Sequence, residues 1–400
     1  MRISTQTFYL RSLTAMLQQQ SALSNTQNQV ATGRRVNSPA DDPIAAVHIL
    51  ELQRAKAESD QYAQNSDIAR GRLNLEEQSL NDVSSVIERV RELTVQAANT
   101  GTYTNADRQS IAIELANRLD ELLDIANRKD GNGEFMFSGF ASLTQPFARD
   151  VTGTVQYAGD QGARLVQVGP AQRVADGHSG ADVFLNIAAG NGTFVTSAAA
   201  ANTGTGVITV GSVTDQAAWV ADNYTLSFTA PDAYQITDGL GNVVTTGAYT
   251  SSSAIQFNGI QLQISGTPAT GDTFAVAPSI AEDVFATLQK IVTSLNTPAG
   301  SGPSNAQLAS TLGNSLQQLD QITDHLLGVR AEVGARLSAL DDADTSRDVL
   351  SVDLQASISE LRDLDYAEAL TRMNQQLVGL QAAQLSYTKI SQLSLFNYLG

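Results

Sequence analysis

Residues 366–387 read YAEALTRMNQQLVGLQAAQLSY. Apolar and glutamine side chains recur in this run at alternating spacings of four and three residues, which places them along one face of a helix. The face comprises Tyr366, Leu370, Met373, Leu377, Leu380, Gln384 and Tyr387, and Leu395 and Phe396 add apolar side chains near the end of the chain. A helix this long and narrow cannot bury an apolar face by itself, so the pattern predicts a coiled-coil-like partner.

The N-terminal end of the chain repeats the same spacing. Its seam comprises Tyr9, Leu13, Met16, Gln20, Leu23, Gln27 and Val30. Glutamines dilute the apolar surface, so one such helix buries too little area to offset the entropy lost on ordering. We therefore expect residues 1–44 and 365–400 to pair as an inner domain that orders in a ring of subunits, with both seams serving as the assembly interface.

Helical patterns continue inward from both ends. Apolar positions recur at helical spacing over residues 73–90, 111–125 and 284–295, and no proline interrupts residues 304–400. A loop around residues 99–105 contains Asn99-Thr100-Gly101, a plausible helix stop. The patterns predict a helical-bundle middle domain formed by residues 45–144 and 279–364.

The middle of the chain has a different composition. Residues 145–278 are dominated by glycine, threonine, valine and alanine, with short alternating runs that are typical of strands. Turn signals are dense, among them Asp238-Gly239 and the Asn258-Gly259 pair between two apolar stretches. The predicted fold class is thus mainly α, with an all-β outer domain inserted between helical segments.

The string VNSPADDP, residues 36–43, follows the N-terminal seam. Either Ser38 before Pro39 or Asp42 before Pro43 places a side-chain acceptor at a helix start, with a proline where its missing N–H costs nothing. The predicted bend between the inner and middle domains comprises Asn37, Ser38, Pro39, Asp41, Asp42 and Pro43.

Composition excludes several classes of function. Of the 400 residues, 41 are acidic and 24 are basic, so no basic face is expected to bind nucleic acid or anionic lipid. No apolar run approaches the length of a membrane span, and residues 1–13 are too polar for a cleavable signal peptide. The chain has no cysteine, which removes disulfides and thiolate sites.

No residues suggest catalysis, a cofactor or a metal. His48, His178 and His325 fall in three different segments, without the local spacing of a zinc site. Residues 177–181, GHSGA, lack the final glycine of a nucleophile elbow and are more economically a glycine-rich turn. The acids of residues 341–348 lack the central glycine and final glutamate of a calcium loop.

The N-terminal string ATGRRVNSPADDP, residues 31–43, resembles the signature of flagellins and flagellin-like hook-associated proteins of the bacterial flagellum. The run from Asp365 to Leu399, with its alanine-leucine-glutamine seam, resembles the C-terminal helix of the same family. NSPADDP at 37–43, GEFMFSG at 133–139 and Pro146-Phe147 favour the members at the hook–filament junction over flagellin. The resemblance covers about residues 1–175 and 280–400, with a further similar segment at 259–274.

This resemblance implies a structural subunit, without enzymatic activity, that is required for filament assembly and motility. The implied partners are hook-associated protein 1, flagellin, further copies of the chain in a ring, and an export chaperone. The implied location is the extracellular flagellum, reached through the flagellar type III export apparatus without a cleaved signal. Two alternatives stay open: flagellin itself, and a secreted adhesin whose β insert binds a surface.

Overall fold

The computed structural model describes residues 5–99 and 103–392. Two compact units emerge, one formed by residues 1–64 and 342–400, the other by residues 65–341. The boundaries of these two units differ from those of the three domains expected from the sequence. The three-domain division stays a prediction. Each unit is described by itself below.

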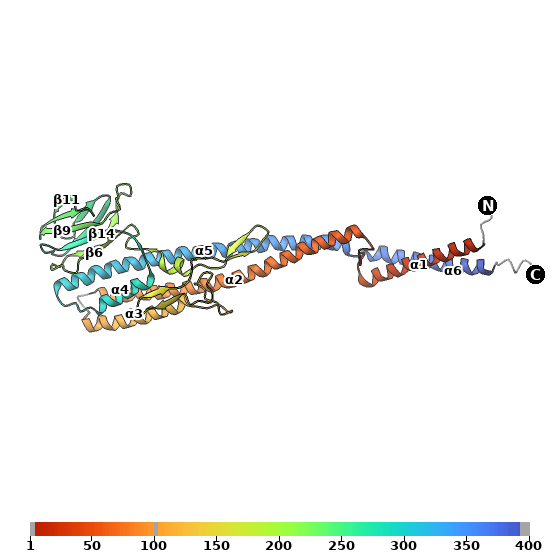
Figure 1. The fold of residues 1–400 in the computed structure, drawn as a ribbon, viewed down its shortest axis with the longest axis horizontal. Coiled ribbons are helices and arrows are strands. Elements are labelled where there is room, and N and C mark those ends of the chain that lie inside the picture. The colour runs from red at the N-terminus through yellow and green to blue at the C-terminus, as the bar shows by residue number, and fades with distance from the viewer. Residues whose placement is uncertain (1–4, 100–102, 393–400) are drawn as a thin grey trace, which may run out of the picture. The chain divides into compact units, whose positions relative to one another are not determined.

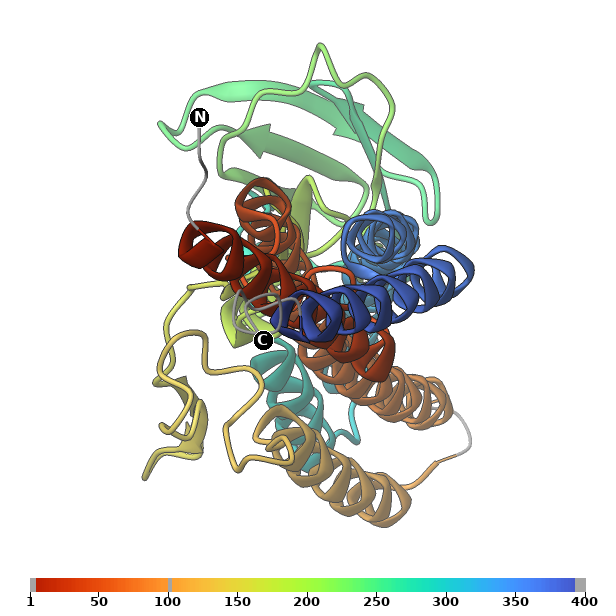
Figure 2. The same cartoon turned by 90° about the vertical axis from the view of Figure 1, so that its right-hand side faces the viewer.

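The first unit is helical and contains both ends of the chain. Helices α1 (Thr5–Thr32) and α6 (Tyr366–Gln392) lie side by side (Figures 1 and 2). The unit also contains the start of α2 (Pro43–Ala98) and the end of α5 (Gly302–Arg362). Val36, Ala45 and Ile49 form a small core against Leu361. The expected pairing of the terminal helices is confirmed.

Helices form the body of the second unit. α2 and α5 run antiparallel, joined by the ion pairs Arg91–Asp320, Arg330–Glu77 and Arg70–Asp341. The helices α3 (Asn105–Ala126) and α4 (Val284–Asn296) pack against each other. The apolar positions expected from the sequence, such as Leu80 and Leu122, are fully buried. α2 ends at Ala98, and most of the predicted Asn99-Thr100-Gly101 stop lies outside the described residues.

Short strands after α3 cover the helices around an aromatic core. Two hairpins, β1–β2 and β3–β4, are followed by a π-helical turn, η1, and by the pair β5–β15. Phe147 lies with its ring centroid 5.0–5.4 Å from those of Tyr157, Phe184 and Phe285. The strands are β1 (Phe147–Arg149), β2 (Val155–Tyr157), β3 (Leu165–Gln167), β4 (Arg173–Ala175), β5 (Ile187–Ala188) and β15 (Ala281–Glu282), and the π-helical turn η1 spans Ala181–Leu185.

Residues 194–278 form two antiparallel sheets that share one apolar core. The larger sheet has the order β11-β10-β9-β14-β6; the smaller has β12-β13-β7, with β8 also paired to β13. Their strands are β6 (Phe194–Ala198), β7 (Val207–Ile208), β8 (Ser212–Val213), β9 (Tyr224–Ala230), β10 (Ala233–Thr237), β11 (Val243–Ala248), β12 (Ala254–Phe257), β13 (Ile260–Ser265) and β14 (Thr273–Pro278). The predicted β insert is confirmed.

The β12–β13 hairpin shows how the sequence sets this register. Asn258 and Gly259 both have positive φ, 43° and 75°, as a type I′ turn requires. A Cβ on Gly259 would lie 2.2 Å from the Asp215 carbonyl oxygen, so only glycine fits there. The turn brings Phe257 opposite Ile260 and aligns two apolar faces toward the shared core.

The sheets are anchored on α5 by polar contacts. Asn314 donates to the Thr196 carbonyl at 2.6 Å, Gln318 accepts from the Gly190 amide at 2.8 Å, and the Ser310 hydroxyl accepts from the Ile208 amide at 3.3 Å. These contacts place the sheets against the first half of α5, as Figure 1 also shows.

Candidate assembly interface

α1 and α6 pack antiparallel through one face of each helix. The Gln19 side-chain amide donates to the Gln376 carbonyl at 3.3 Å, Arg372 donates to Gln29 at 3.3 Å, and a Cβ on Gly33 would lie 2.8 Å from the Tyr366 hydroxyl. Polar groups thus alternate with apolar contacts along the pair. Such polar seam positions set register at some expense of stability.

The structure divides the predicted seam residues between two faces. One group is partly or fully buried in the unit: Leu13, Met16, Leu23, Val30, Met373, Leu380 and Tyr387. The other group is exposed: Gln20, Gln27, Leu370, Leu377 and Gln384. Leu395 and Phe396 lie outside the described residues. The seam residues therefore differ in exposure within the unit, and their role as an assembly interface stays a prediction.

The exposed face carries apolar side chains that periodicity alone had not singled out. Leu10 and Leu17 are spaced by seven residues on α1, as are Val378 and Leu385 on α6, and all four are 54–65% exposed. Leu370 and Leu377 extend this stripe on α6, 40–42% exposed. A helix pair that buries one apolar stripe and exposes another has a surface suited to further helices.

The segment between α1 and α2 is tied to the segment between α5 and α6. The Arg35 amide donates to the Arg362 carbonyl at 2.6 Å, and the Leu364 amide donates to the Gly33 carbonyl at 3.0 Å. The Arg35 guanidinium reaches the Leu361 carbonyl at 2.7 Å and the Asp42 carboxylate at 3.1 Å. Both chain crossings therefore form one bonded junction.

The sequence offers two candidate helix N-caps, Ser38 and Asp42, and in the structure Asp42 caps α2. Its carboxylate accepts from the Ala45 amide at 3.0 Å, and Pro43 is the first residue of α2. Asp41 accepts from the Ser38 amide at 2.8 Å and the Asn37 amide at 3.1 Å, which folds the preceding loop. The bond from Ser38 lowers the pKa of Asp41, and the bonds from Ala45 and Arg35 lower the pKa of Asp42.

Acid should therefore loosen this junction. A carboxyl group with a lowered folded-state pKa stabilises above its ordinary value of 3.8 and loses that contribution as pH falls through the folded value. Asp42→Asn keeps a cap acceptor that does not titrate. In this variant the amides of residues 44–46 should lose hydrogen-exchange protection less steeply between pH 5 and pH 3 than in the parent chain. Equal pH profiles for Asp42→Asn and the parent chain would contradict this assignment.

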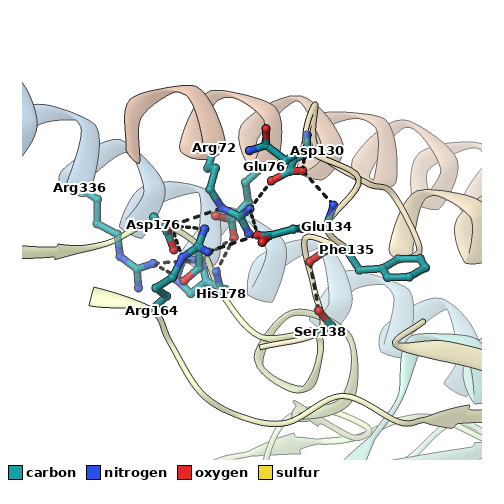
Figure 3. Close-up of polar contacts among 12 residues, drawn as sticks. Arg72, Glu76, Asp130, Glu134, Phe135, Ser138, Arg164, Asp176, His178 and Arg336 are labelled. Carbon is teal, nitrogen blue, oxygen red and sulfur yellow. Dashed lines mark hydrogen bonds and ion pairs between the residues drawn. The ribbon is translucent and has the colours of Figure 1, made fainter. Parts of the chain in front are cut away.

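A buried polar cluster lies in the second unit (Figure 3). The Arg72 guanidinium from α2 pairs with Asp130, Glu134 and Asp176, and Arg164 reaches Asp176 at 2.7 Å. Asp176 is only 3% exposed. Ion pairs at this depth contribute little net stability, but removing one partner leaves a buried charge at high cost. No single segment of the sequence predicts this cluster, because its members lie far apart in the chain.

Two other kinds of feature are absent from the part of the chain that the structure describes. Among the described residues, no cluster of three metal-ligating side chains is present. Neither is any helix of the described ranges long and apolar enough to cross a membrane.

Comparison with known proteins places these features in one family. A model described as the bacterial flagellin N-terminal helical region matches residues 3–142, and one for the C-terminal helical region matches residues 316–399. A model of the D2-like domain of flagellar hook-associated protein 1 matches residues 197–278. Paired terminal helices around an inserted β domain thus define a flagellin-like subunit of the bacterial flagellum.

More specific relatives cover the whole chain. Flagellar hook-associated protein 3 of Salmonella typhimurium is 25% identical over 99% of both chains, and that of Escherichia coli is 26% identical over the same share. The crystal structure of Xanthomonas campestris FlgL is 33% identical, covers 77% of this chain and 99% of its own, and has a TM-score of 0.73. Hook-associated protein 3 from Legionella pneumophila, also 33% identical, covers 78% and 98%, with a TM-score of 0.76. The chain belongs to the flagellar hook-associated protein 3 family.

Flagellins are more distant relatives. The flagellin of Bacillus subtilis is 33% identical, but over only 35% of this chain. The family is structural and flagellar, which locates the chain in the flagellum and among other flagellar components.

Proposed function

We propose that the chain is the structural subunit that joins the hook to the filament. Full-length similarity to hook-associated protein 3 carries this proposal, and a solved relative from Legionella pneumophila is described as the flagellar junction protein. The exposed apolar stripe on the terminal helices also supports this proposal, because a subunit that did not assemble would leave these apolar side chains in water.

In this proposal, hook-associated protein 1 binds on the hook side and flagellin on the filament side, with copies of the chain forming a ring between them. The seam residues of α1 and α6 and their exposed stripe form the contacts, and the junction at residues 37–43 is the bend between the inner and middle domains. The chain leaves the cell through the flagellar type III export apparatus, without a cleaved signal, accompanied by a chaperone that covers α6.

The decisive experiment uses isolated hooks that end in hook-associated protein 1. The purified full-length chain should bind these hooks and then support flagellin growth, as seen by electron microscopy. The chain alone, at the same concentration, should form no long filaments. Filaments formed by the chain alone would favour flagellin instead, and hooks that ignore the chain would contradict the junction proposal.

A further inference from the structure

The buried cluster contains a histidine held by two carboxylates from different helices. His178 Nδ1 lies 2.7 Å from a carboxylate oxygen of Glu76 on α2, and Nε2 lies 3.0 Å from one of Glu332 on α5. An ionised carboxylate only accepts hydrogen bonds, and an imidazole donates from both nitrogens only when it is protonated. Geometry alone therefore favours the charged imidazolium.

The surrounding charges favour the same state. The cluster's carboxylates are Glu76, Asp130, Glu134, Asp176 and Glu332, and its guanidiniums are Arg72, Arg164 and Arg336. Arg336 approaches His178 Nδ1 at 3.5 Å and donates a hydrogen bond to the Gly177 carbonyl. Two further acids nearby have partners of their own, because Glu77 forms an ion pair with Arg330 and Asp182 accepts a hydrogen bond from Ser179. Acids outnumber the fixed cations, so a positive imidazole brings the cluster closer to neutrality.

Glu76 makes the cluster sensitive to that charge. Its side chain is 1% exposed, and one of its oxygens has no hydrogen-bond partner among the described residues. The other oxygen accepts from both the ring and the backbone amide of His178. A neutral imidazole would leave the Glu76 carboxylate buried with weaker compensation, which favours opening of the site to water.

We propose that His178 is a protonation-controlled clasp that holds residues 164–186 onto α2 and α5, closed with the charged imidazole and loosened as the proton leaves. The clasped segment leads directly into the β5 strand and the sheets beyond it. Loosening the clasp therefore weakens the attachment of the β insert at its N-terminal end, while the contacts of Asn314 and Gln318 keep the sheets on α5.

The direction of the pH dependence follows from the partners. Burial acts to lower the pKa of His178, but the bond and charge of Glu76 and the bond to Glu332 outweigh it and raise the pKa above 6.5. The bond from His178 lowers the pKa of Glu332 below 4.5. A raised histidine pKa gives stability that is complete below about pH 6.5 and falls as pH rises through the folded-state value.

The pKa itself can be measured on the full chain. Its three histidines give three imidazole signals in a ¹⁵N–¹H NMR titration, and His178→Gln assigns the buried one. The signal of His178 should titrate above the ordinary histidine value of 6.5. Glu332→Gln should lower the pKa of His178 without unfolding the chain, because Glu332 is 65% exposed. A His178 pKa at or below 6.5 would overturn the proposal.

Release of the segment is measured by hydrogen exchange of residues 164–186, corrected for intrinsic rates. Protection should fall by up to about tenfold per pH unit between pH 6.5 and the folded-state pKa, then level off. Glu332→Gln should shift this fall to lower pH, whereas His48→Gln, the matched histidine change at an exposed position, should leave it in place. Protection that is independent of pH in the parent chain would refute the clasp, even if His178→Gln proved unable to fold.

Discussion

Glutamate at both Leu377 and Leu385 is expected to leave the α1–α6 pair folded and to abolish binding to hooks that end in hook-associated protein 1. Both leucines lie on the exposed stripe, 40% and 65% exposed, so they contribute little to the pair itself. Fully burying an exposed leucine contributes about 1.5–3 kcal/mol, so burying the exposed parts of these two side chains contributes about 2–3 kcal/mol together. Losing both should weaken binding by about a hundredfold or more.

A matched control separates the loss of apolar surface from the added charge. Gln375→Glu with Ser386→Glu places two charges at exposed positions on another side of the same helix. This control should bind hooks like the parent chain, with equal helical content by circular dichroism for all three proteins. Equal loss of binding in both double variants would point to charge, and normal binding of the leucine variant would remove the stripe from the interface.

Phe147→Ala is expected to reduce the stability of the second unit by about 3–5 kcal/mol. The ring is fully buried and contacts Tyr157, Phe184 and Phe285, which join the β1–β2 hairpin, η1 and α4. Removing it leaves a cavity where three elements meet, and the surrounding rings cannot all close on it.

Urea unfolding measures this effect with two signals. Circular dichroism follows the helices, and fluorescence of Trp219, the one tryptophan of the chain, follows the sheets. Phe140→Ala provides the same chemical change at a position that is 67% exposed, and it should cost less than about 0.5 kcal/mol. A similar cost for both variants would show that the aromatic cluster does not hold these elements together.

Features that depend on residues close together in the chain could be predicted from the sequence. The terminal helices follow from their spacing, and the β12–β13 hairpin follows from Asn258-Gly259, because local chemistry alone sets both. The Asp42 cap was one of two options, since Ser38-Pro39 carries an equivalent signal. Only the tertiary bonds around Arg35 distinguish them.

Features that depend on residues far apart in the chain could not be predicted from the sequence. Gln20 and Gln27 continue the apolar spacing of α1, yet Gln19 and Thr26 face inward instead, because the partner helix decides which side is covered. The clasp joins Glu76, His178 and Glu332, which lie about a hundred or more positions apart. No pattern within a short stretch of sequence could have related them, and the GHSGA string around His178 was interpreted as a glycine-rich turn in preference to a nucleophile elbow.

The bonded junction at residues 33–36 and 361–364 also bears on the order of folding. During synthesis, α1 emerges first and α6 last, so α1 stays without its partner until almost the entire chain exists. Closing a loop of that length across an unfolded chain costs entropy that grows with the logarithm of its length. Once the Arg35–Arg362 and Gly33–Leu364 bonds have formed, however, the remaining loop is only a few residues long. We therefore expect the pairing of α1 and α6 to begin at these bonds and to proceed toward the two chain ends, as pairing in a β-hairpin proceeds from its turn.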